Sequence, residues 1–171
     1  DDAAAIDGQH RVFAPLWLCL RSTAQTQIGA GVRQIARSAE GGTDLKLLHD
    51  LSARIREAIS YEINASEPTW SAEDAIAAGR GVCQDHTHVF VACARHLGFP
   101  ARYVSGYLMM NDRVDQDATH AWAEAHVDDL GWVGFDVSNA ISPDMRYVRV
   151  ATGLDYTPTT PGARRHSRHG G

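Results

Sequence analysis

The spacing of apolar residues along this chain changes near Gly98, and this change constrains the fold more than any other feature. Between residues 45 and 59, leucine and isoleucine recur every three or four positions, which predicts an amphipathic helix capped by Thr43 or Asp44. From residue 101 to 109 the apolar positions alternate instead, as in a half-buried strand. Helices followed by adjacent strands favour an α+β fold with an antiparallel sheet.

The same periodicities predict further elements on both sides of this change. Ser71 and Asp74 are placed for a capping box, and Gly79 is placed to end the helix that they start. Residues 64–70 are expected to form a loop. The further predicted helices are 22–39, 71–79 and 83–96, and the further predicted strands are 120–127, 131–137 and 145–153.

Composition indicates a single soluble domain. The chain has 171 residues, of which 44% are hydrophobic and 22% are charged, enough to bury a core. A net charge of −5 argues against nucleic acid as a partner, and no apolar run reaches the roughly 18 residues that cross a membrane. With only three cysteines and no recognisable leader segment, we expect a reducing compartment, the cytoplasm. The chain does not begin with methionine, which leaves open that it is a piece of a longer protein.

Residue types that act in catalysis or metal binding are clustered in the stretch GRGVCQDHTHVF, residues 79–90. If Cys83 lies at the start of the predicted helix, unpaired backbone N–H groups and the helix dipole favour its thiolate. The same N–H groups could hold an oxyanion that develops on a substrate carbonyl. A cysteine nucleophile still requires a base and a group that orients the base.

His120 and Asp136 are the candidates for these two roles, because they lie on the two strands of one predicted hairpin. If residue 120 lies directly opposite residue 136, both side chains share one face of the sheet, about 5 Å apart at Cβ. The carboxylate could then hold one imidazole nitrogen while the other faces the sulfur. A slip of one residue would turn the pair to opposite faces.

Four motifs, GVCQD, LGFPARYVSGYL, HAWAE and GWVGFDVSN, closely resemble the bacterial transglutaminase-like superfamily, which has a papain-like core and includes predicted cysteine proteases. The resemblance covers about residues 45–162. It implies that Cys83 is the nucleophile, His120 the base and acid, and Asp136 the orienting carboxylate, with no cofactor. It also implies attack on a carboxamide to give a thioester, which water or an amine then resolves.

The resemblance divides the chain into three parts. Residues 1–43 are expected to be an N-terminal helical extension, interpreted as the remnant of a truncated N-terminal region. Residues 44–162 are expected to form the catalytic core, and residues 163–171 a flexible basic tail. One departure from the family lies at His86, where an aromatic residue is usual. We interpret His86 as a solvent-facing polar residue, with a perturbing effect on the Cys83 thiol as the alternative.

Other residues near the predicted triad receive supporting roles. We expect the backbone N–H of Gln84 to help hold the oxyanion, and Asp85 and His88 to brace the site through hydrogen bonds. The polar stretch 111–118 before His120 is a candidate for substrate selection. Three tryptophans are candidates to line the substrate groove, with packing as the alternative: Trp70, Trp122 and Trp132.

The CQDHTH stretch also allows a zinc-site interpretation, from Cys83 and His86 with Asp85, His88 and His96 nearby. We predict no metal, because the sequence has neither a CxxC pair nor an HExxH motif. The leading prediction is a cysteine hydrolase that cleaves a peptide, isopeptide or side-chain amide of a peptide or protein substrate. The alternatives are an amine-dependent acyltransferase and a non-catalytic domain that binds a protein partner.

Overall fold

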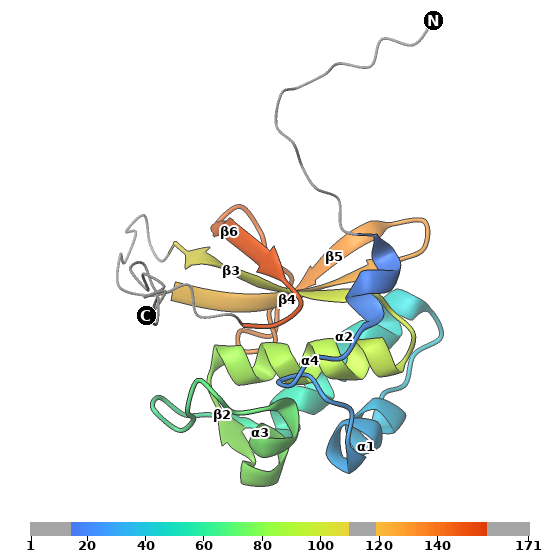
Figure 1. Ribbon diagram of the computed structural model, residues 1–171. Helices are drawn as coiled ribbons and strands as arrows, with labels where there is room; N and C mark the ends of the chain where they lie inside the picture. The colour runs from blue at the N-terminus through green and yellow to red at the C-terminus, as the bar shows by residue number, and fades with distance from the viewer. Residues whose placement is uncertain (1–14, 110–118, 157–171) are drawn as a thin grey trace, which may run out of the picture.

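The computed structural model describes residues 15–109 and 119–156, in which helices and sheet form separate layers (Figure 1). The elements are η1 (Leu16–Leu20), α1 (Ala30–Ser38), α2 (Asp44–Ala58), β1 (Ser60–Tyr61), α3 (Ala72–Ala78), β2 (Arg80–Gly81), α4 (Cys83–His96), β3 (Ala101–Leu108), β4 (Thr119–Val127), β5 (Gly131–Phe135) and β6 (Tyr147–Gly153). The predicted α+β fold with an antiparallel sheet is confirmed. None of the helices in these ranges is long and apolar enough to span a membrane.

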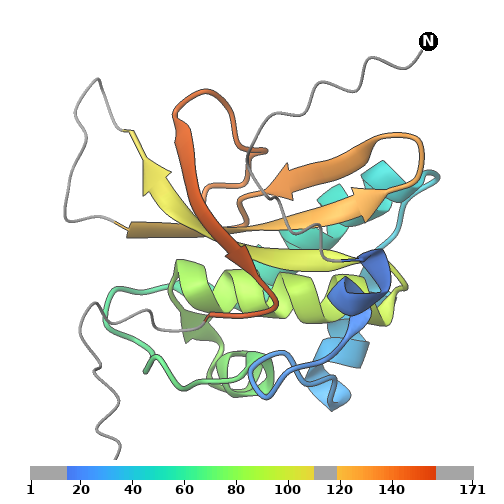
Figure 2. The ribbon, with the colours of Figure 1, turned by 45° about the horizontal axis from the view of Figure 1, so that its top comes forward.

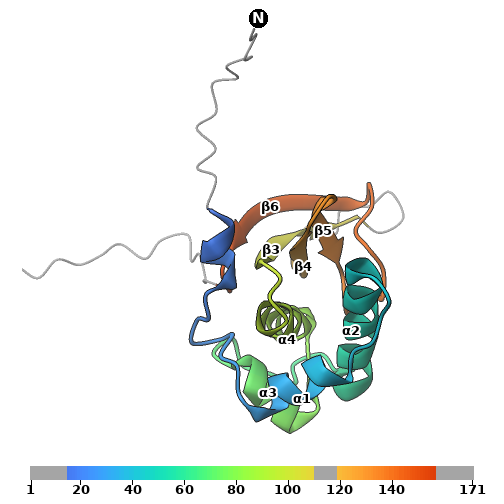
Figure 3. The same cartoon turned by 90° about the vertical axis from the view of Figure 1, so that its right-hand side faces the viewer.

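Helix α4 occupies the centre of the molecule. The view along its axis shows the sheet on one side of α4, α1 and α3 on the opposite side, and α2 beside it (Figure 3). The run from Val89 to Ala94 is fully buried, because a helix with apolar residues on all sides must be covered on all sides. Phe90 stacks on Phe135 at the end of β5, with ring centroids 4.9 Å apart, and so joins the helix to the sheet.

The helices around α4 begin and end where local chemistry requires it. The Thr43 hydroxyl accepts the backbone N–H of Lys46 at the start of α2. Ser71 and Asp74 form the predicted capping box of α3, and Gly79 ends that helix with a φ of 67°, a conformation that favours glycine. The predicted helices at 45–59, 71–79 and 83–96 are thus present with boundaries that differ by one residue at most.

The helix predicted at residues 22–39 is shorter in the structure than predicted. Residues 22–29 are not helical, and α1 begins only at Ala30, after Gly29. Thr23 and Thr26 form a turn instead, in which the hydroxyl of each accepts the backbone N–H of the other at 3.3 and 3.0 Å. Such local side-chain bonds compete with a helix for the same N–H groups, which explains why the helix starts late.

The four-stranded sheet has the order β5-β4-β3-β6, with every neighbouring pair antiparallel (Figure 2). On β4 the alanines at 121, 123 and 125 are buried, and those at 123 and 125 belong to the core that contains α4. Small residues on this face let helix and strand approach closely. The alternate positions, which include His120, Trp122 and Glu124, point to the other face.

A second, parallel pair joins β1 to β2, with Ser60 beside Arg80 and Tyr61 beside Gly81. It was not predicted, because two residues per strand leave no period in the sequence. The pair matters because it brings Tyr61 close to the start of α4. The boundary predicted between residues 43 and 44 stays a prediction, although Val32, Ile35 and Ala36 of α1 are part of the same core as α4. The tail at 163–171 and the stretch 111–118 lie outside the described residues.

Candidate active site

Cys83 is the first residue of α4, as predicted, and its side chain is half-buried. The carboxylate of Asp85 accepts the backbone N–H of Val82 at 2.9 Å and the hydroxyl of Ser66, which fixes the first turn. In this first turn the N–H groups of Asp85 and His86 donate to the Val82 carbonyl at 3.0 and 3.1 Å. The N–H groups of Cys83 and Gln84, the first two residues of the helix, are the ones that can face a negatively charged atom at this end. Gln84 is anchored outside the turn, where its side-chain amide donates to the Pro68 carbonyl at 3.1 Å.

His120 lies near the start of β4 and connects Cys83 to Asp136. Its Nε2 is 2.6 Å from Oδ2 of Asp136, and the Cys83 side chain lies near enough to the ring to raise its pKa. Because Nε2 is occupied by the carboxylate, Nδ1 is the nitrogen left to face the sulfur. The structure thus brings together the three residues predicted as a triad, from a helix start, a strand and the residue after a strand.

The register of the hairpin differs from the predicted one. Residue 120 was expected opposite residue 136, whereas Glu124 pairs with Gly134 and Ala123 with Phe135, a shift of two residues. Asp136 lies just past β5, in an isolated bridge with Ile141. Side chains alternate with a period of two, so a shift of two keeps Asp136 on the face of His120 and the contact survives.

The Asp136 carboxylate is almost fully buried and holds several donors. Its Oδ2 accepts the side-chain amide of Asn139 at 2.8 Å and the hydroxyl of Tyr147 at 2.6 Å, and its Oδ1 accepts the backbone N–H of Asn139 at 3.3 Å. Burial raises the pKa of Asp136, but the bonds from His120 and Asn139 outweigh it and hold this pKa below its usual range. The carboxyl is therefore ionised at neutral pH.

Asn139 and Tyr147 were missed by the sequence analysis. Asn139 stands at the end of the GWVGFDVSN motif, three residues after Asp136, where a turn residue can donate back to a carboxylate. Tyr147 reaches Asp136 from β6, and no pattern in the neighbouring sequence predicts that contact.

The imidazole of His120 carries a proton at neutral pH. Burial lowers its pKa, but the hydrogen bonds to Asp136 and Cys83 outweigh burial and raise the pKa to about 9. An imidazolium next to a sulfur stabilises a thiolate. The geometry therefore places an imidazolium, held by a buried carboxylate, beside the Cys83 sulfur.

Two cavities meet at Cys83, Thr119 and His120. The small cavity has a volume of about 290 Å³ and the large cavity about 560 Å³. The small cavity is also lined by Tyr61, Leu108, Ser138 and Asn139. The large cavity is also lined by Val82, Gln84, Tyr103, Ser105, Gly106, Tyr107, Ala121, Val150 and Tyr156. Because Cys83 and His120 lie between the two cavities, one part of a substrate could occupy each cavity while the bond to be cleaved lies at the sulfur.

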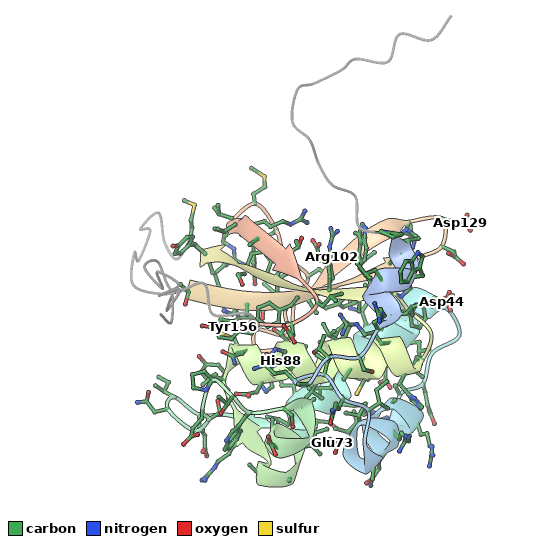
Figure 4. The ribbon with its side chains drawn as sticks, viewed as in Figure 1. Asp44, Glu73, His88, Arg102, Asp129 and Tyr156 are labelled. Atoms are coloured by element: carbon green, nitrogen blue, oxygen red, sulfur yellow. The ribbon has the colours of Figure 1, made fainter. Side chains whose placement is uncertain are left out.

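His88 lies further along α4 and does not touch the triad. It is fully buried, and its Nε2 accepts the backbone N–H of Tyr156 at 3.0 Å; Figure 4 shows the two residues close together. Burial lowers the pKa of His88 to about 4, so the ring is neutral and can accept. His88 therefore holds the segment after β6 on α4, where Tyr156 forms part of the large cavity.

The three tryptophans occupy packing positions, and none lines either of the two cavities at Cys83. Trp122 is buried and packs edge-on against Tyr147, with ring centroids 5.2 Å apart, so it supports the residue that donates to Asp136. The Arg102 guanidinium lies over the ring of Trp132, with its central carbon 3.9 Å from the ring centroid. Trp70 packs at the edge of the core.

The interpretation of His86 as solvent-facing is wrong. Its side chain is about 1% exposed, and its two ring nitrogens lie 2.8 Å from Ser138 Oγ and 2.8 Å from the Ile59 carbonyl. The reason is that α4 is covered on all sides at this point, so His86 is enclosed although it is polar.

Among residues 15–109 and 119–156, no group of three or more His, Cys, Asp and Glu side chains is placed to hold a metal ion.

The family model of the transglutaminase-like superfamily matches residues 32–137, which include Cys83, His120 and Asp136. The chain belongs to this superfamily. An uncharacterized Mycobacterium tuberculosis protein is 35% identical over 127 residues, which are 68% of this chain and 40% of that protein. An uncharacterized Mycobacterium leprae protein is 30% identical over 148 residues, 83% of this chain and 52% of that protein. The chain thus spans about two fifths to one half of these relatives.

Two solved structures share the fold. A candidate cysteine protease of Cytophaga hutchinsonii superposes with a TM-score of 0.71 at 25% identity, over 82% of this chain and 47% of that one. The periplasmic domain of TgpA from Pseudomonas aeruginosa superposes with a TM-score of 0.58 at 21% identity, over 73% of this chain and 47% of that one. These likenesses support the papain-like core predicted for the transglutaminase-like chain.

Proposed function

We propose that this transglutaminase-like chain hydrolyses an amide of a peptide or protein through a thioester on Cys83. The observation that carries the proposal is the arrangement of three side chains: Cys83 and His120 line the same two cavities, and His120 is held by Asp136 at 2.6 Å. The similarity to a candidate cysteine protease at 25% identity supports the same reaction class. The three free cysteines support the cytoplasm as the compartment of this chain.

The residues can perform each step of this reaction. The Cys83 thiolate attacks the amide carbon, the C–S bond forms, and the carbonyl electrons move to the oxygen, which faces the N–H groups that begin α4. When the C–N bond breaks, the His120 imidazolium gives its proton to the departing nitrogen. Water then attacks the thioester while His120 takes its proton, and the C–S bond breaks to give an acid and the thiolate.

The first test is the pH dependence of Cys83 alkylation by iodoacetamide, measured by mass spectrometry. We expect labelling that is fast well below about pH 8 and much slower in the His120→Ala variant. His126→Ala is the matched control, because His126 is another half-buried histidine on the same face of β4. Buried Cys19 and Cys93 serve as internal references.

Labelling of Cys83 at the rate of an ordinary thiol, unaffected by His120→Ala, would contradict the proposal and favour a non-catalytic binding domain. Acyl transfer is separated from hydrolysis by adding a primary amine to the thioester intermediate. Acceleration of thioester turnover by the amine would favour the acyltransferase, and an unchanged rate would favour the hydrolase.

A further inference from the structure

The buried His86 fixes the direction of a hydroxyl in the small cavity. One ring nitrogen, Nε2, lies 2.8 Å from the carbonyl oxygen of Ile59. A carbonyl oxygen can only accept a hydrogen bond, so Nε2 must carry the proton of a neutral ring. The tautomer of His86 therefore follows from its partner.

The other nitrogen of His86 determines what Ser138 does. Nδ1 lies 2.8 Å from Ser138 Oγ. Burial lowers the pKa of His86, so the ring holds one proton, on Nε2, and Nδ1 is an acceptor. The Ser138 hydroxyl must then donate to Nδ1. Its hydrogen is thereby turned toward the core, and the oxygen presents lone pairs to the small cavity that Ser138 lines.

Asn139 has the same polarity for a different reason. Its side-chain Nδ2 donates to Oδ2 of Asp136 at 2.8 Å. The carbonyl oxygen of that amide is consequently the end turned away from the carboxylate, and Asn139 also lines the small cavity. Ser138 thus has its only donor committed to His86, whereas Asn139 commits one amide N–H to Asp136. Both residues of the wall beside Cys83 keep an acceptor oxygen.

An acceptor oxygen at Ser138 favours a ligand that carries a donor at this point of the wall. We propose that the small cavity binds the N–H side of an amide substrate, and that Ser138 accepts a hydrogen bond from this N–H group. This inference rests on the proposed amide hydrolysis and adds the residue that distinguishes an amide from an ester. An ester has an oxygen in place of the N–H, so its lone pairs would face those of Ser138.

The test uses two small alkylating reagents that react with Cys83 and differ only by N–H in place of O, N-methyliodoacetamide and methyl iodoacetate. Second-order rate constants at Cys83 are measured by mass spectrometry, with glutathione as the free-thiol reference. We expect the amide-to-ester ratio at Cys83 to exceed that of glutathione by about five- to tenfold, the effect of one hydrogen bond. Ser138→Ala should return the ratio to within about twofold of glutathione.

Ser105→Ala is the matched control, because Ser105 is a half-buried serine that lines the large cavity instead. It should keep the wild-type ratio. His86→Phe is a second variant, which removes the acceptor of the Ser138 hydroxyl and frees its hydrogen to turn into the cavity; the ratio should fall there too. Thermal unfolding followed by circular dichroism identifies variants that keep the native fold.

The outcomes separate this inference from the proposed function. An amide-to-ester ratio equal to that of glutathione, or one that survives Ser138→Ala, would overturn the role of Ser138 whether or not His120 activates the thiol. A high ratio that depends on Ser138, together with labelling unaffected by His120→Ala, would keep the recognition of N–H groups and overturn the catalytic proposal.

Discussion

Replacing Asp136 with asparagine should lower the proton affinity of His120 sharply. The buried carboxylate lies 2.6 Å from Nε2 and is the largest of the influences that raise the pKa of His120 to about 9. Asparagine has nearly the same shape but no charge, and its amide can donate to Nε2 instead of accepting from it. The imidazolium then loses its principal partner while its burial stays the same.

The size of the effect follows from the pKa itself. Between about 9 and the ordinary value near 6.5, the protonated ring is favoured by about 3 kcal/mol, at 1.36 kcal/mol for each pH unit. Cys83 supplies part of this stabilisation, so we expect Asp136→Asn to remove more than half of it. The pKa of His120 should fall by at least about 1.5, which is roughly 2 kcal/mol.

The assay is an NMR titration of the histidine ring signals from pH 5 to pH 10. The signal of His120 is identified by its loss in His120→Gln. The control is Asp144→Asn, because Asp144 is an exposed carboxylate that pairs with Arg146. A pKa of His120 that changes by less than about 0.5 in Asp136→Asn would refute the assignment of Asp136 as the group that holds the imidazolium.

Three further predictions concern stability. Because the pKa of His88 is lowered to about 4 when folded, the unfolded chain takes up its proton first as the pH falls below 6.5. Urea unfolding should therefore show a loss of about 2 kcal/mol between pH 7 and pH 5 that is absent in His88→Gln. The contribution of His120 to the free energy of unfolding has the opposite dependence on pH. It is fully present below pH 6.5 and is lost as the pH rises through about 9. The free energy of urea unfolding should therefore depend less on pH above 6.5 in His120→Gln than in the wild type. Gly106→Ala should lower the free energy of unfolding by about 2 kcal/mol or more, since its Cβ would lie 2.6 Å from the Trp122 ring and closer still to the Val148 carbonyl; an unchanged thermal transition would contradict that packing.

The sequence was most informative where its signals are local. The helix that starts at Cys83 is marked by a preceding glycine pair and an apolar run that ends at Gly98. Each feature lies at or within the helix itself, so both could be interpreted without knowing the fold. The capping box of Ser71 and Asp74 is predictable for the same reason.

Features that depend on distant segments were not accessible in this way. The hairpin register was displaced by two residues, because the alternation of side chains fixes which face a residue occupies but not which residue it opposes. Tyr147 reaches Asp136 across the sheet from β6. His86 was misplaced because its burial depends on Ile59 and Ser138, which lie far from it in the sequence.

The close packing of α4 on β4 has a consequence for how the reactive pair is maintained. Cys83 belongs to the helix and His120 to the strand, and the alanines at 123 and 125 let these two elements touch. The relative position of sulfur and imidazole therefore depends on how closely α4 packs on β4. A methyl group added at Ala123, which is fully buried against α4, would displace the helix relative to the strand, so a change in the core would act on the chemistry without touching either residue.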